Sequence, residues 1–512
     1  MPFMYNIPAA PFLLDDIRHL QSSATFNGKI VGFKIETTSC GRAETLLALD
    51  FSLDISTDRV IDVSGNNRHS ILTNAPTRAV TGHDWDASQN DWTHASYGYG
   101  ALHCHDDDLD DAAWETSFEL RIPSKLRSGC YGVHVDDGVT QDIIPFIVRP
   151  DLKTRKPPLV ALIMPTFTCI AHANEHLYDE TRDVHFADQK LKRDQYLDTL
   201  EKRSDLGISL YDGHSDVSST CYSSSKRPIL NMRPNYSFWA HGGPRGLSAD
   251  LWYMGFLERE LGSHGYDVIT DHELSEYDES LLKRYEVLVS GSHPECSTYN
   301  MLKSYGSYLE DSGHFITFGL PPGNWHHSLT GEAGGLWRTR GRPSNQLFGI
   351  GSCVVGVAHG VGYGITEEAR SDPWLAFLFH GAGLETARTI GDFGLIQKAA
   401  SGDGIDRLEF DLGTLQNAVI VATSKLTGGH WDGYHLLTEE STVLRANTTG
   451  TTSEKIRSDL VFFETATGGA IFSAGSMNWV GAFAWKNYEN NVAQITANAL
   501  HEFRHRKEST GA

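Results

Sequence analysis

The stretch Leu159-Val-Ala-Leu-Ile-Met164 decides the fold of the larger part of the chain. An unbroken apolar run of this length is typical of a strand that is buried on both faces of a parallel sheet. Similar runs recur at Glu286-Val-Leu-Val-Ser290, His314-Phe-Ile-Thr-Phe318 and Val419-Ile-Val-Ala-Thr423. Helical stretches lie between several of these runs. The sequence therefore predicts a largely parallel sheet covered by helices, whose ligand crevice lies at the carboxyl ends of the strands.

Two segments carry the pattern of a helix. Apolar residues at 251, 254, 257 and 261 lie on one face of the stretch Asp250–Leu261, and Ser248 precedes it as a candidate N-cap. The stretch Tyr299–Glu310 is the second predicted helix.

The first 150 residues have a different pattern, with short strand-like runs separated by Asn, Gly, Asp and Pro. Regularly spaced short strands favour a β-sandwich, although the spacing also fits a barrel. A charged, Pro-rich stretch, Lys153-Thr-Arg-Lys-Pro-Pro158, marks a boundary near residue 150. The predicted organisation is thus a β-sandwich domain over 1–150, an α/β domain over 151–505 and a tail over 506–512.

Composition excludes several classes of protein. The 512 residues include 43 Lys plus Arg and 65 Asp plus Glu, a net charge of −22, which repels phosphate backbones and anionic lipids. Nucleic acid is therefore not an expected partner. No apolar stretch approaches the length of a membrane span, and the first residues lack the features of a signal peptide, so we expect a cytoplasmic protein. Seven scattered cysteines without C-x-x-C pairs indicate free thiols.

The densest reactive cluster is Gly291-Ser-His293-Pro-Glu295-Cys296, directly after a predicted strand. A His and a Glu two residues apart can serve as metal ligand and general base, because imidazole exchanges protons near neutrality and a carboxylate binds hard cations. The alternative is an ordinary capped loop that leads into the helix at Tyr299.

Two more clusters carry reactive side chains, one directly after a predicted strand and one in a polar segment. The first is Pro165-Thr-Phe-Thr-Cys169-Ile-Ala-His172, and the second is Leu210-Tyr211-Asp-Gly-His214-Ser-Asp216. Phenolate suits Fe(III), whereas imidazole and thiolate suit Zn or Fe(II), so the side chains bias the choice of metal. The clusters meet in one crevice only if the strands before them are neighbours in the sheet.

Other motifs are weaker indications of a site. The string His103-Cys-His-Asp-Asp-Asp-Leu-Asp-Asp111 resembles a metal site, but an acidic run is more often a solvated segment or a turn, so we expect no metal there. The sequence contains neither G-x-x-x-x-G-K-[ST] nor G-x-S-x-G, which argues against nucleotide hydrolysis and against an α/β-hydrolase.

Together the motifs resemble the large (beta) subunit family of N,N-dimethylformamidase, over most of the chain. The matching blocks share their order along the sequence and include Asp62-Val-Ser-Gly-Asn-Asn-Arg-His69, His103-Cys-His-Asp-Asp-Asp108, Pro165-Thr-Phe-Thr168, Leu210-Tyr-Asp-Gly-His-Ser-Asp216, Ser292-His-Pro-Glu295 and Gly331-Glu-Ala-Gly-Gly-Leu-Trp-Arg338.

The resemblance implies a lectin-like β-sandwich followed by a three-layer α/β domain similar to class I glutamine amidotransferases. It also implies an amidohydrolase that cleaves a small N-substituted formamide through one non-haem Fe(III), held by two tyrosines and a glutamate. By position, Tyr211 corresponds to one tyrosine ligand, Glu295 to the glutamate and His293 to the neighbouring histidine. Asn324 corresponds to a residue that orients the substrate.

The chain departs from the family pattern where the other tyrosine is expected, and we predict His172 as the ligand there, with Cys169 as the alternative. Replacing phenolate by neutral imidazole shifts preference from Fe(III) toward Fe(II), Zn or Mn, with iron still the first expectation. A second departure is Cys296, where the family usually has Tyr. The family also implies a homo-oligomer, with a small partner subunit as an option.

The predicted reaction is attack of a metal-activated water on a small amide, with His293 or a carboxylate as base and Asn324 near the oxyanion. One alternative is a cysteine hydrolase that uses Cys296, because the thiol follows a buried strand and has His293 close in sequence. The other is a non-catalytic relative that binds carbohydrate through its sandwich domain.

Overall fold

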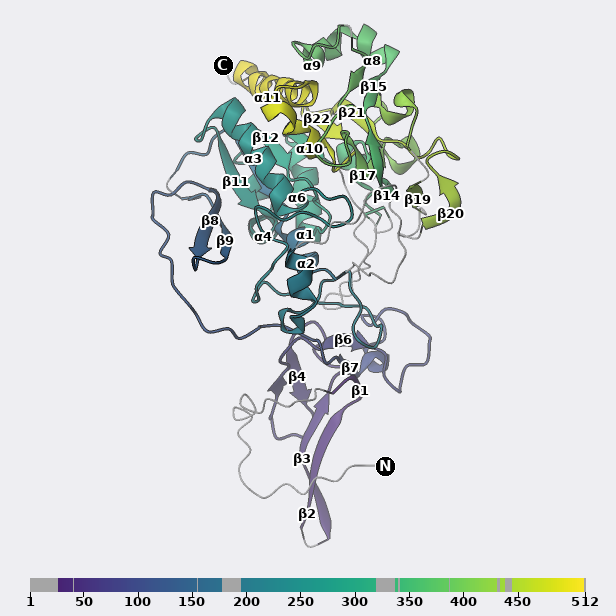
Figure 1. Ribbon diagram of the computed structural model, residues 1–512. Coiled ribbons are helices and arrows are strands. Elements are labelled where there is room, and N and C mark those ends of the chain that lie inside the picture. Colours follow the sequence, from purple (N-terminus) through teal and green to yellow (C-terminus); the bar gives the residue numbers. More distant parts are fainter. Residues whose placement is uncertain are drawn as a thin grey trace. The chain divides into compact units, whose positions relative to one another are not determined.

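The computed structural model describes residues 26–39, 41–153, 155–176, 195–318, 337–338, 341–385, 387–430, 433–437 and 444–510. Internal contacts divide the chain into two compact units (Figure 1). Unit 1 contains residues 1–108 and 214–218, and unit 2 contains residues 109–213 and 219–512. The domain boundary near residue 150 stays a prediction.

Unit 1 is built from antiparallel strands in two sheets, with the orders β1-β7-β6 and β2-β3-β4-β5. Phe51, Val60 and Leu102 form a small shared core between strands of both sheets. The β-rich prediction for this part of the chain is confirmed, whereas a lectin-like sandwich stays a prediction. The strands are β1 (Gly28–Ile30), β2 (Phe33–Ser39), β3 (Arg42–Asp50), β4 (Arg59–Asp62), β5 (Ser70–Ile71), β6 (Thr77–Val80) and β7 (Ala101–Cys104).

Unit 2 is organised around a mixed sheet with the strand order β11-β10-β12-β13-β22-β21-β18-β15-β16. The first five strands in this order run parallel to one another, and each later pair, beginning with β22 and β21, is antiparallel. These strands are β10 (Val160–Met164), β11 (Tyr266–Thr270), β12 (Val287–Ser290), β13 (His314–Phe318), β15 (Tyr363–Ile365), β16 (Thr389–Ile390), β18 (Val419–Thr423), β21 (Asp459–Glu464) and β22 (Ala470–Ala474).

Two smaller antiparallel sheets complete the strands described in unit 2. One is a hairpin, and the other has the order β17-β14-β19-β20. Their strands are β8 (Gly129–Asp136), β9 (Gln141–Val148), β14 (Gly351–Val361), β17 (Ser401–Arg407), β19 (Tyr434–Leu437) and β20 (Leu444–Thr449).

Helices cover both faces of the mixed sheet, because alternate residues of a strand point to opposite faces. Val160, Leu162 and Met164 pack with side chains of α3, α10 and α11, whereas Ala161 and Ile163 pack with those of α4, α5 and α6. The helices are α1 (Thr166–Ala171), α2 (Gln195–Leu200), α3 (Leu247–Leu261), α4 (Asp271–Tyr277), α5 (Glu279–Leu282), α6 (Tyr299–Glu310), α7 (Ser344–Phe348), α8 (Glu367–Ser371), α9 (Ala376–Phe379), α10 (Trp479–Phe483) and α11 (Asn491–Thr510). The last helix includes 506–510, most of the predicted tail.

Most of the strand and helix predictions hold, and two need correction. The apolar runs that became β10, β12 and β13 are parallel strands, and the second predicted helix is α6. Strand β18 is antiparallel to both neighbours, so its assignment to a parallel sheet was wrong. Ser248 is not the N-cap of α3, because the helix begins at Leu247 after Gly246 and the Ser248 hydroxyl donates to the carbonyl oxygen of Tyr236 at 2.8 Å.

Among the described residues, no helix is both long enough and apolar enough to cross a membrane.

Asp250 ties helix α3 to the loop after β12. Its Oδ1 accepts a hydrogen bond of 2.6 Å from the backbone amide of Ser292, and its Oδ2 has no partner among the described residues. The side chain is fully buried, and this burial raises the pKa of Asp250 to about 7. The carboxyl group is therefore mostly protonated below about pH 7 in the folded chain.

Asp250→Asn should remove a pH dependence from the stability of unit 2. Because the pKa is raised by folding, the stabilising contribution of Asp250 is complete below its ordinary pKa of 3.8 and is lost as the pH rises through about 7. The midpoint of thermal unfolding, measured from pH 5 to pH 8, should fall more for the wild type than for Asp250→Asn, with a difference in unfolding free energy of roughly a few kcal/mol. Parallel curves for the two proteins would contradict the assignment.

Candidate active site

The candidate site lies where two neighbouring parallel strands of unit 2 end. Strands β10 and β12 pair in register, so the loops that follow them start side by side. The hydroxyl of Thr168, in α1, accepts hydrogen bonds from the backbone amides of Glu295 at 3.0 Å and Cys296 at 3.1 Å. This pairing holds the loop after β12 against the helix that follows β10.

His172 ends helix α1 and lies between two carboxylates. Its Nδ1 is 2.9 Å from Glu175 Oε2, and its Nε2 is 3.1 Å from Glu295 Oε2. Burial alone would lower the pKa of His172, but the hydrogen bonds to Glu175 and Glu295 outweigh it and raise the pKa to about 9. Without an ion, His172 is therefore an imidazolium that bridges two carboxylates.

His293 lies on the other side of Glu295 and has the opposite electrostatic character. Its Nε2 is 3.4 Å from Glu295 Oε2, and the side chain is 5% exposed. Burial, together with the positive charges of Arg245 and His172, holds the pKa of His293 well below its usual range. The two imidazoles of the site thus differ in charge, and His293 is the one with a lone pair available.

Tyr211 packs its ring flat against His172, with ring centroids 4.1 Å apart and planes 10° apart. The backbone amide of the preceding Leu210 donates to the carbonyl oxygen of Ala171 at 2.9 Å, which fixes this loop beside α1. Burial and the nearby carboxylate of Glu295 raise the pKa of Tyr211 well above its ordinary value. The phenol is therefore protonated unless a cation lies next to its oxygen.

A pocket of about 410 Å³, counting solvent at its mouth, opens beside these groups. The side chains that line it and carry chemistry are Cys169, His172, Glu175, Tyr236, Arg245 and His293. Glu295 contacts both lining imidazoles, so the pocket leads to the cluster of ionisable groups.

The donor atoms fit a metal ion. One ligand atom each of His172, His293 and Glu295 lies within 4.8 Å of the others. Glu175 holds the second nitrogen of His172, which is the arrangement by which a carboxylate orients a metal-ligating imidazole. Two imidazoles and a carboxylate are a donor set for Fe(II) or Zn, and the adjacent phenol of Tyr211 adds a harder oxygen.

The structure brings together four of the predicted site residues, namely His172, Tyr211, His293 and Glu295. Asn324 lies outside the described residues. Cys169 lines the pocket, but burial and the nearby Asp250 raise the pKa of its thiol, so the donor contacts favour His172 over Cys169 as the ligand.

Burial and the adjacent carboxylate of Glu295 also raise the pKa of the Cys296 thiol well above its ordinary value. A nucleophilic cysteine needs a lowered pKa, so this environment disfavours the cysteine hydrolase.

Sequence reasoning missed Glu175, Tyr236 and Arg245. Glu175 Oε1 accepts a hydrogen bond of 3.2 Å from the hydroxyl of Tyr236, so the carboxylate that holds His172 is itself held. The one sequence signal was the spacing of Glu175, three residues after His172. Arg245 and Tyr236 belong to a loop far from the motifs, and no local pattern marks them.

The fold and the site define an α/β protein with a buried centre of imidazole, phenol and carboxylate groups at the carboxyl ends of parallel strands. The family model described as N,N-dimethylformamidase beta subunit-like, C-terminal, matches residues 77–320 and 317–492. The chain therefore belongs to the N,N-dimethylformamidase beta subunit family.

Individual relatives agree with this membership. The chain is 32% identical to the N,N-dimethylformamidase beta subunit of Paracoccus aminophilus and 31% identical to that of an Alcaligenes species, in each case over 94% of this chain and 68% of the relative. Among solved structures, a ThuA-like protein from Bacteroides uniformis is 12% identical with a TM-score of 0.30, covering 50% of this chain and 86% of its own. This structural similarity is too low to assign a fold family, and the likeness to glutamine amidotransferases stays a prediction.

Gly291→Ala should push apart the two loops of the site. A Cβ atom at Gly291 would lie 2.4 Å from Cδ of Pro165, in the loop after β10, and 3.0 Å from Oδ1 of Asp250. Relieving this overlap costs about 1–3 kcal/mol of stability. Chemical denaturation should show that loss for Gly291→Ala and no loss for the control Gly306→Ala, whose added Cβ meets only Leu347 at 3.9 Å. Equal stability of the two variants would contradict the close approach of the loops.

Proposed function

We propose that the chain hydrolyses the C–N bond of a small N-substituted amide, with a formamide as the first candidate substrate. The observation that carries the proposal is the position of Glu295, whose carboxylate lies between His172 and His293 beside a pocket that both imidazoles line. The two relatives that match 94% of this chain are named as beta subunits of an N,N-dimethylformamidase.

The residues we propose as metal ligands are His172, Tyr211 and Glu295. His172 and Glu295 belong to a group of donor atoms within 4.8 Å of one another, and Tyr211 packs against His172. A bound ion supplies Lewis-acid polarisation of the amide carbonyl and a lower pKa for a water molecule. Iron is the first expectation, and Zn or Mn is expected if His172 sets the preference in place of a phenolate.

The protein groups supply proton transfer and orientation. His293 is neutral because its pKa is lowered, so its imidazole can accept a proton from the attacking water and pass it to the leaving amine. Glu175 keeps His172 oriented through Nδ1. Arg245 lines the pocket as a cation, where it favours a substrate oxygen that gains negative charge. Asn324 remains the proposed partner of that oxygen.

We also propose that the chain works in an assembly. The relatives are named as beta subunits, which supports a second kind of subunit, and a homo-oligomer of this chain is the other expectation.

Glu295→Gln should abolish both the bound metal and the turnover of N-substituted formamides. The variant removes the charge that links His172 and His293, and losing a metal-activated water costs at least about a hundredfold in rate. Metal content by elemental analysis and formate release should fall together. The matched control is Glu273→Gln, a buried glutamate of unit 2 in the N-terminal capping box of α4.

Full activity of Glu295→Gln without metal would overturn the proposal. Cys296→Ser distinguishes the cysteine mechanism from the metal mechanism. It should stop hydrolysis if Cys296 is the nucleophile, but should leave metal-assisted hydrolysis mostly intact. A protein with neither metal nor turnover of any amide, and with affinity for sugars, would instead favour the carbohydrate-binding alternative.

Tyr211→Phe should remove a visible absorption band from the iron-loaded protein. Phenolate bound to Fe(III) gives a charge-transfer band, and Tyr211 is the phenol that packs against His172. The control Tyr253→Phe removes a buried hydroxyl elsewhere in unit 2 and should leave the spectrum unchanged. A band that survives in Tyr211→Phe would exclude Tyr211 as the ligand, and a colourless zinc or manganese protein would point to a different metal.

A further inference from the structure

Unit 1 contains a second group of imidazoles and carboxylates that the proposed reaction does not use. Two of its histidines, His103 and His105, come from the end of β7 and the residue after it. Asp216 comes from the segment 214–218, more than a hundred residues later in the chain and part of the same unit. The fold thus brings together side chains that are far apart in sequence.

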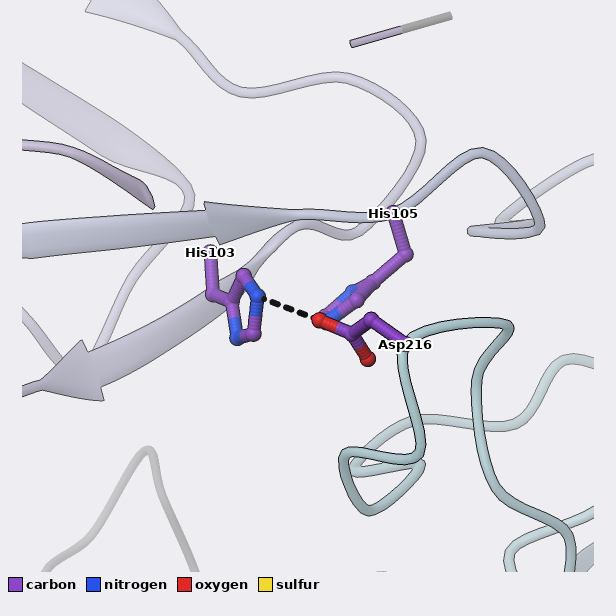
Figure 2. Close-up of side chains that lie close together, drawn as sticks. All are labelled: His103, His105 and Asp216. Atoms are coloured by element: carbon purple, nitrogen blue, oxygen red, sulfur yellow. Dashed lines mark ion pairs between the residues drawn. The ribbon is translucent and has the colours of Figure 1, made fainter. Parts of the chain in front are cut away.

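These three side chains point toward one another (Figure 2). His103 Nε2 lies 3.0 Å from Asp216 Oδ2, and the His103 and His105 rings have centroids 4.1 Å apart with planes tilted by 51°. One ligand atom from each residue lies within 4.8 Å of the others. Ligand atoms around a tetrahedral ion with bonds of about 2.0–2.1 Å are roughly 3.3 Å apart, so small side-chain rotations suffice to bind one.

His105 is held in place from behind. Its Nδ1 lies 3.1 Å from Asp108 Oδ1, and Asp108 Oδ2 accepts a hydrogen bond of 2.7 Å from the backbone amide of His105. Its Nε2 lies 2.9 Å from Ser218 Oγ, and that hydroxyl donates to Asp216 Oδ1 at 2.6 Å. A carboxylate on one nitrogen orients the imidazole and makes the other nitrogen a better ligand, as around known metal centres.

The third imidazole, that of His214, is not placed to bind the same ion as His105. Its ring stacks on His105 with centroids 3.6 Å apart and planes only 2° apart, and its Nδ1 lies 2.5 Å from Asp107 Oδ1. Imidazole lone pairs lie in the ring plane, so two parallel rings do not direct them to one point. The tilted pair His103 and His105 does.

The surroundings favour a cation. Asp106 Oδ1 accepts a hydrogen bond of 2.6 Å from the hydroxyl of Ser215, the residue before Asp216. Asp107 and Asp108 contact His214 and His105, so three further carboxylates add negative charge around the group.

We propose that His103, His105 and Asp216 bind a divalent first-row transition-metal ion, at a site separate from the candidate active site. Two imidazoles and one carboxylate match the preferences of zinc and of ferrous iron. The ion joins the end of β7 to the segment 214–218, so it stabilises unit 1 by closing a long loop.

The test counts zinc ions in the full chain. After equilibrium dialysis against Zn²⁺, the variant Asp216→Asn should bind one ion fewer than the wild type and lose at least about tenfold in zinc affinity at this site. The same loss should appear when both proteins also carry Glu295→Gln, which separates this site from the proposed active site. His83→Asn, which alters an exposed His83 and Asp84 pair at 3.1 Å, is the matched control and should bind as many ions as the wild type.

A second readout guards against adventitious binding and misfolding. In the Glu295→Gln background, added Zn²⁺ should raise the midpoint of thermal unfolding, and Asp216→Asn should abolish that rise while unfolding normally without zinc. Asp216 is partly exposed, so the substitution leaves the core of unit 1 unchanged. The proposal would be overturned if proteins with and without the Asp216→Asn substitution bound the same amount of zinc and showed the same rise in unfolding midpoint on adding zinc.

Discussion

One hydroxyl group, that of Thr168, fixes the relation between the two loops of the candidate active site. Parallel pairing of β10 and β12 brings the loops to the same edge of the sheet but leaves their separation open. The Thr168 oxygen then accepts two backbone amides, those of Glu295 and Cys296, in a setting where Thr168 is 3% exposed and water cannot replace them. The contact between His172 and Glu295, and hence the character of the whole site, depends on this pair of hydrogen bonds.

Much of the α/β architecture could be predicted, because unbroken apolar runs report burial on both faces. The same reasoning failed for β18, since an antiparallel strand inside the sheet is also largely buried and its sequence does not encode the direction of its neighbours. The error at Ser248 has a related cause. A serine before an amphipathic stretch is a good local signal for an N-cap, but the hydroxyl is used in a tertiary contact with Tyr236 that no local pattern contains.

The two candidate sites differ in how many of their residues could be predicted from the sequence. His172 and Glu295 lie in polar clusters that follow predicted strands, and the family resemblance marks them as ligands, whereas Arg245 approaches the pocket from a loop with no motif of its own. The acidic string after His103 predicts a solvated segment, since a high density of charged residues is typical of exposed chain. It contains a histidine, His105, that is 4% exposed and stacked on His214, because a distant segment completes unit 1 there.

The segment 214–218 also affects how unit 1 can be passed from one gene to another by recombination. Unit 1 includes residues 214–218 as well as 1–108, so the chain passes from unit 2 into unit 1 and back within a few residues. A single recombination crossover in the gene cannot transfer unit 1 whole to another protein. The two units are therefore expected to have evolved as one heritable block, and a search for the first unit alone, as a free-standing module in other proteins, should find few examples.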